Sequence, residues 1–116
     1  MVGARSAEGR DEFLRYHSAA IEIPSPTITR IESISRATDV FLVIGVIEKE
    51  GGTCYCTIIF VDPRAGYVAK HRKLMPTAAE RLIWGLGDAT TLPVLEKTFS
   101  SEKGVANTKL SATICW

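Results

Sequence analysis

The fold is decided by residues 40–74, VFLVIGVIEKEGGTCYCTIIFVDPRAGYVAKHRKL. The apolar run over residues 39–50 is typical of a buried strand, and it becomes polar at its end. The pair Gly51–Gly52 is a hairpin signal. Residues 53–63 form the expected return strand, and residues 67–74 a third strand whose alternation weakens into a basic end. The stretch therefore predicts an antiparallel meander of three strands.

Two helices are expected before this meander. Residues 7–22 place acidic residues early and aromatic residues at helical spacing. Residues 27–37 read as a second amphipathic helix, although their isoleucines also allow a strand. Its expected buried face consists of Ile28, Ile31 and Ile34.

One short helix and two strands are expected after the meander. Residues 77–85 form the helix, with Thr77 as N-cap and Glu80 in its first turn. Residues 91–100 and 105–116 supply the strands. The order of elements predicts one α+β domain over residues 1–116. Because strands this apolar need cover on both faces, and two helices supply too little, we expect a piece of a larger domain.

Composition limits the classes of partner. Hydrophobic residues make up 46% and charged residues 23%, which is ordinary for a globular protein. A formal net charge of +1 gives no electrostatic basis for binding nucleic acid or an anionic membrane. The sequence shows no apolar run of bilayer length and no secretory signal at its start. A cytoplasmic protein is therefore expected.

Three cysteines stand at positions 54, 56 and 115. Cys54 and Cys56 point the same way on a strand, so they could form half of a metal site. No second Cys/His pair at zinc spacing accompanies them, and His17 and His71 are distant in the sequence. We therefore expect the pair to act as small hydrophobes in a core strand, with no metal site.

Three features carry possible chemistry. Cys115 ends an apolar strand, where it is either a structural thiol or a nucleophile that meets a pocket. The segment KHRKLMPT, residues 70–77, is either a solvated basic turn or a source of a lysine beside an apolar pocket. Such a lysine can stabilise an oxyanion or a thiolate. Glu80 is either a helix N-terminal acid or a carboxylate carried toward the same strand ends.

Together these features resemble a known family. HRKLMPT (71–77), ERLIWGLGD (80–88) and KLSATICW (109–116) follow one another as in the nitrilase branch of the carbon–nitrogen hydrolase superfamily. The upstream segment GRDEFLRYHSAAIEIPSP, the strand stretch quoted first and GDATTLPVLEKTF match the same family in order. The resemblance covers nearly the whole chain.

The resemblance implies a Cys-Glu-Lys hydrolase with a partial α-β-β-α sandwich, incomplete at both ends. By position, Cys115 corresponds to the nucleophile, Lys73 to the catalytic lysine and Glu80 to the second active-site glutamate, and Trp116 would contact substrate. Such enzymes convert a nitrile to a carboxylic acid and ammonia through a covalent thioimidate. The resemblance implies no cofactor, and a homo-oligomeric full-length parent.

The chain also departs from the family pattern. The general-base glutamate of the family would precede Val2, the sequence that follows the nucleophile is absent after Trp116, and Ser111 replaces a glycine. We therefore expect a fragment that is inactive by itself. Amide or carbamoyl hydrolysis and nitrile or cyanide hydration remain open, because they share the same three residues. A non-catalytic interaction domain is the alternative from another class.

Overall fold

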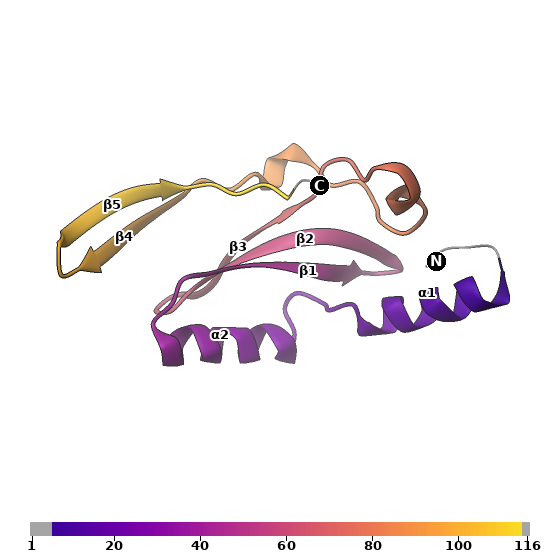
Figure 1. Cartoon of the computed structure of the whole chain (residues 1–116), viewed down its shortest axis with the longest axis horizontal. Coiled ribbons are helices and arrows are strands. Elements are labelled where there is room, and N and C mark those ends of the chain that lie inside the picture. The colour runs from indigo at the N-terminus through magenta and orange to yellow at the C-terminus, as the bar shows by residue number, and fades with distance from the viewer. Residues whose placement is uncertain (1–5, 115–116) are drawn as a thin grey trace.

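A computed structural model describes residues 6–114 (Figure 1). No helix in this range combines the length and apolarity that a membrane span needs. In chain order, the elements are α1 (Ala7–Ala19), α2 (Pro26–Thr38), β1 (Leu42–Glu50), β2 (Thr53–Asp62), β3 (Gly66–Arg72), the 3-10 helices η1 (Ala78–Leu82) and η2 (Ala89–Thr91), β4 (Leu95–Ser101) and β5 (Gly104–Leu110).

The predicted meander is confirmed. Strands β1, β2 and β3 form an antiparallel sheet in that order. Gly51 takes a φ of 57° in the β1–β2 turn, a backbone conformation that glycine adopts without a steric penalty. The β2–β3 turn is closed by Asp62, whose Oδ1 accepts hydrogen bonds from the main-chain N–H groups of Arg64 and Ala65. Both turns thus close antiparallel hairpins, and the β2–β3 register shifts between Phe60 and Val61.

Helix α2 packs on one face of this sheet. Its Ile28 is buried against Ile59 and Val61 of β2. The expectation that Ile34 is buried is wrong, because its side chain is 48% exposed. The neighbouring Ser35 is buried instead, and its hydroxyl donates a hydrogen bond of 2.7 Å to the carbonyl of Val40. The end of α2 is thus held to the following chain by the polar contact of Ser35 and not by burial of Ile34.

A buried carboxylate extends the core on the same face of the sheet. Glu48 on β1 is 1% exposed and accepts hydrogen bonds from Thr57, Lys70 and Arg72. Burial pushes the pKa of Glu48 up, but the hydrogen bonds from these three donors outweigh burial and bring the pKa to about 2. The ionised Glu48 therefore links all three strands.

Helix α1 is shorter than the expected 7–22. It ends at Ala19, and Ile21 pairs with β1 through the N–H of Ile21 to the carbonyl of Ile47 (2.9 Å) and the N–H of Lys49 to the carbonyl of Ile21 (2.7 Å). These bonds to the edge strand β1 satisfy the N–H and carbonyl groups of Ile21, which would have bonded within the helix if it had continued.

The end of the chain differs most from expectation. The predicted helix 77–85 is the short 3-10 helix η1, and the predicted strand 105–116 is β5, which ends at Leu110. Residues 111–114 have no regular structure, so the expected strand does not continue toward Cys115. Leu110 pairs with Leu95, the first residue of β4. Pro93, two residues before Leu95, has no N–H to extend the ladder.

The molecule is elongated because the β4–β5 hairpin projects beyond the sheet at one end and helix α1 at the other (Figure 1). Its extents are 57 × 27 × 23 Å, and its radius of gyration is 16.5 Å. A compact domain of this length would have a radius of gyration of about 13 Å. The α+β class is confirmed, as part of the sandwich that the resemblance implies.

Candidate active site

Lys73 follows β3 directly, and its main chain is held on both sides. Its N–H donates to the carbonyl of Cys56 (2.8 Å), and its carbonyl accepts from the N–H of Gly87 (3.0 Å). The side chain is only 6% exposed. The ammonium group therefore starts from a fixed backbone and reaches into a sheltered position.

Glu80 on η1 is the partner of this ammonium group. Its Oε2 accepts hydrogen bonds from Lys73 Nζ (2.7 Å), from the N–H of Thr77 (2.7 Å) and from the Thr77 hydroxyl (3.0 Å). The hydrogen bond from Lys73, followed by that from the Thr77 main chain, lowers the pKa of Glu80. The carboxylate is thus ionised at neutral pH, and it acts as the acceptor in its contact with Lys73. The structure brings these two residues together.

Trp84 completes this cluster and was not predicted. The centre of its ring lies 5.8 Å from Lys73 Nζ, within cation–π range. Its indole N–H donates a hydrogen bond of 2.7 Å to the hydroxyl of Tyr16 on α1. The sequence could not reveal this contact, because Tyr16 and Trp84 are far apart along the chain.

Within residues 6–114, the two thiols are those of Cys54 and Cys56 on β2. Cys54 is buried and Cys56 is half-buried, and neither is in a disulfide. Burial raises the pKa of Cys56, although the nearby Lys73 opposes this. A protonated thiol is a poor nucleophile, so both cysteines fit the structural role expected from the sequence. No group of three potential metal ligands occurs within residues 6–114.

The predicted nucleophile Cys115 and the predicted substrate contact Trp116 lie outside the described residues. Of the three proposed catalytic residues, the structure therefore places Lys73 and Glu80. These two supply a fixed cation and its counter-ion. Such a pair can stabilise negative charge that develops on a substrate nitrogen or oxygen.

Comparison with known families gives a match to the carbon-nitrogen hydrolases over residues 4–116. The chain belongs to this family. This carbon-nitrogen hydrolase chain is 67% identical over 119 residues to an arylacetonitrilase of Trametes versicolor, covering 100% of the chain and 37% of that relative. The match includes the segments that carry Lys73, Glu80 and Cys115.

Two plant proteins are also similar. Nitrilase 1 of Arabidopsis thaliana is 48% identical over 115 residues, which cover 99% of this chain and 31% of that relative. The bifunctional nitrilase/nitrile hydratase NIT4 of Oryza sativa subsp. japonica is also 48% identical over 115 residues, 99% of this chain and 30% of that relative. The carbon-nitrogen hydrolase chain thus spans about a third of the length of the curated relatives it matches.

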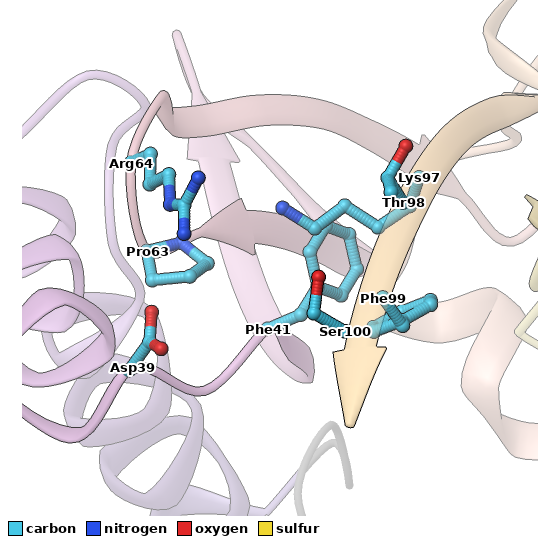
Figure 2. Close-up of a pocket in the computed structure, with 8 residues that line it drawn as sticks. All are labelled: Asp39, Phe41, Pro63, Arg64, Lys97, Thr98, Phe99 and Ser100. Carbon is cyan, nitrogen blue, oxygen red and sulfur yellow. The ribbon is translucent and has the colours of Figure 1, made fainter. Parts of the chain in front are cut away.

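A separate pocket of about 190 Å³ lies between the β4–β5 hairpin and the sheet. Figure 2 shows the residues that line it: Asp39, Phe41, Pro63, Arg64, Lys97, Thr98, Phe99 and Ser100. It shares no residue with the cluster of Lys73, Glu80 and Trp84. Its Lys97 forms an ion pair with Asp62 of β2.

Proposed function

We propose that this chain supplies the lysine, a glutamate and the nucleophile of a nitrilase-type hydrolase, which converts an organic nitrile to a carboxylic acid and ammonia. The main support is the sheltered Lys73–Glu80 pair, which occurs in a chain similar over its whole length to an arylacetonitrilase. In the proposed mechanism, the Cys115 thiolate forms a bond to the nitrile carbon while the nitrogen takes up a proton, giving a thioimidate.

Two water molecules complete the proposed reaction. The first adds to the thioimidate carbon, the carbon–nitrogen bond breaks, and ammonia leaves to give a thioester. The second adds to the thioester, the carbon–sulfur bond breaks, and the acid leaves with the thiol regenerated. Lys73 would stabilise the charge on the nitrogen and then on the oxygen, and Glu80 would keep that cation in place. The general base would be the upstream glutamate that the family resemblance implies.

Hydration to the amide is the second candidate, because several relatives carry the name bifunctional nitrilase/nitrile hydratase. In that reaction the tetrahedral adduct loses the cysteine rather than ammonia. Acid with ammonia, against amide without ammonia, separates the two outcomes.

A chimera provides the test. Residues 1–116 replace the matching stretch of the Trametes versicolor arylacetonitrilase, and acid, amide and ammonia are measured with an aryl and an aliphatic nitrile. We expect hydrolysis, a loss of activity to background for Cys115→Ala, and a drop in kcat of about 100-fold or more for Lys73→Met and Glu80→Gln. Lys109→Met is the matched control, because the Lys109 side chain is 74% exposed.

A folded but inactive chimera would refute the proposal, as would nitrile hydrolysis that survives Cys115→Ala. The isolated 116-residue chain should give no turnover, since the general base of the family lies outside it.

We also propose a cytoplasmic location and a homo-oligomeric assembly of the parent protein. These follow from the composition and from the family resemblance. Cell fractionation and light scattering would test them.

A further inference from the structure

A chain of contacts connects helix α1 to the candidate catalytic lysine. The hydroxyl of Tyr16 accepts a hydrogen bond of 2.7 Å from the indole N–H of Trp84. The ring of Trp84 lies 5.8 Å from Lys73 Nζ. Burial raises the pKa of Tyr16, although the hydrogen bond from Trp84 opposes this. The hydroxyl is therefore neutral at physiological pH, and Tyr16 reaches Lys73 through the indole ring.

The main chain around Trp84 is already fixed without Tyr16. The N–H of Gly85 donates to the carbonyl of Cys54 (2.8 Å), and the N–H of Gly87 donates to the carbonyl of Lys73 (3.0 Å). A Cβ atom on Gly85 would lie 2.8 Å from side-chain atoms of both Thr53 and Tyr55, which shows how closely this segment lies on β2. These contacts hold the backbone of residues 84–87, but they leave the side-chain torsions of Trp84 free.

The hydrogen bond to Tyr16 selects one orientation of that ring. A cation–π contact requires the cation within about 6 Å of the ring centre. The observed 5.8 Å is close to this limit, so a modest rotation of the indole would remove Lys73 from the ring face. Lys73 would then keep Glu80 as its partner but lose the aromatic surface that shelters it.

We propose that Tyr16 is a positioning residue for Lys73: it fixes the Trp84 ring, and the ring holds the lysine ammonium group in its productive direction beside Glu80. This inference rests on the proposed hydrolase function. It adds a residue from the first helix to a site whose other members lie beyond β3, and it assigns the Trp84 ring a role in orienting the lysine.

The kinetic test is a double-mutant cycle in the chimera, with Tyr16→Phe, Trp84→Phe and both together. Loss of one neutral hydrogen bond corresponds to about a fivefold change. We expect Tyr16→Phe to lower kcat by about fivefold and to leave KM for the nitrile within about twofold. The double variant should be no slower than Trp84→Phe alone, because Tyr16 acts only through the indole. Tyr55→Phe is the matched control and should not change kcat.

An unchanged kcat for Tyr16→Phe would overturn the inference, and so would additive losses in the double variant. A change confined to KM would also overturn it, because it would indicate a contact with substrate. The unsubstituted chimera is measured first. If it does not hydrolyse nitriles, the proposed function fails; if it does, the variants test the role of Tyr16 alone.

A second measurement decides the inference without any activity. In the NMR spectrum of the 116-residue chain, the ε-methylene protons of Lys73 should show a ring-current shift from Trp84. Tyr16→Phe should move this signal toward the value of a free lysine, and Tyr55→Phe should leave it in place. A Lys73 signal that is identical with and without the Tyr16 hydroxyl would refute the positioning role.

Discussion

Gly87 determines how closely residues 84–87 approach the lysine that follows β3. A Cβ atom at this position would lie 2.5 Å from the carbonyl oxygen of Arg72 and 2.7 Å from that of Lys73. Backbone atoms cannot move aside as a flexible side chain can. We therefore expect Gly87→Ala to lower the free energy of unfolding by about 1–3 kcal/mol, measured by urea denaturation.

Gly45→Ala is the control for this substitution. Gly45 lies on β1, and an added Cβ would meet no atom within 4 Å. Its effect should stay within about 0.5 kcal/mol. Equal stabilities of the two variants would show that the approach of Gly87 to β3 is not constrained as described.

At the residue scale, local patterns marked the segments around Lys73 and Glu80, and the family resemblance singled out these two residues, whereas contacts between distant segments could not be predicted. Thr77 and Glu80 stand three residues apart in the pattern of a helix start, and Lys73 belongs to a basic strand end that the sequence displays. The pairing of Tyr16 with Trp84 depends on how helix and loop meet in space. No periodicity in either segment carries that information.

Among the elements, the three-stranded sheet owes part of its stability to the buried Glu48. Its folded-state pKa of about 2 lies below the ordinary value of 4.5, so the folded state binds fewer protons than the unfolded chain. The stabilisation is therefore complete above about pH 5 and is lost as the pH falls toward 2. We expect the free energy of unfolding, measured in urea, to decline with falling pH in this range. Glu48→Gln should make this dependence on pH less steep, and it should lower the free energy of unfolding at pH 7 by up to about 3 kcal/mol.

Glu50→Gln is the matched control, because the Glu50 side chain is 65% exposed although it also contacts Arg72. It should change the dependence of the unfolding free energy on pH only a little. Asp62, whose pKa is also about 2, contributes to the same pH range, so Asp62→Asn should independently make this dependence less steep. If the unfolding free energy of Glu48→Gln depended on pH as steeply as that of the unsubstituted chain, ionised Glu48 would not be the source of this stabilisation.

The type of the early elements could be predicted, and that of the later ones only in part. Strands β1 to β3 combine long apolar runs with a glycine turn, so pattern and tertiary structure agree. For η1, the start signal at Thr77 was correct, but the helix ends at Leu82 and not at residue 85. The backbone N–H groups of Gly85 and Gly87 donate hydrogen bonds to β2 and to Lys73 and so do not continue the helix. These tertiary hydrogen bonds cannot be predicted from the sequence alone.

In the molecule as a whole, the β4–β5 hairpin is attached to the sheet by few side chains. Phe99 packs edge-to-face on Phe41 with ring centres 6.5 Å apart, and Lys97 pairs with Asp62. An aromatic pair of this kind contributes about 1 kcal/mol. We expect Phe99→Ala to speed amide hydrogen exchange in β4 and β5 by about fivefold and to leave β1 to β3 protected.

Val105→Ala is the control in the same hairpin, since Val105 is 70% exposed. It should leave exchange unchanged. Faster exchange throughout the sheet in Phe99→Ala would show that hairpin and sheet unfold as one unit, contrary to this expectation.

The separation along the chain between paired residues of the meander also bears on the order of events in folding. No pairing within β1 to β3 joins residues more than about 20 positions apart, and Lys73 and Glu80 are separated by only 7. Contacts so close in sequence form quickly, and nascent chains fold from the N-terminal side. The sheet and the lysine–glutamate pair can therefore form before the contact between Tyr16 and Trp84, which joins residues 68 positions apart.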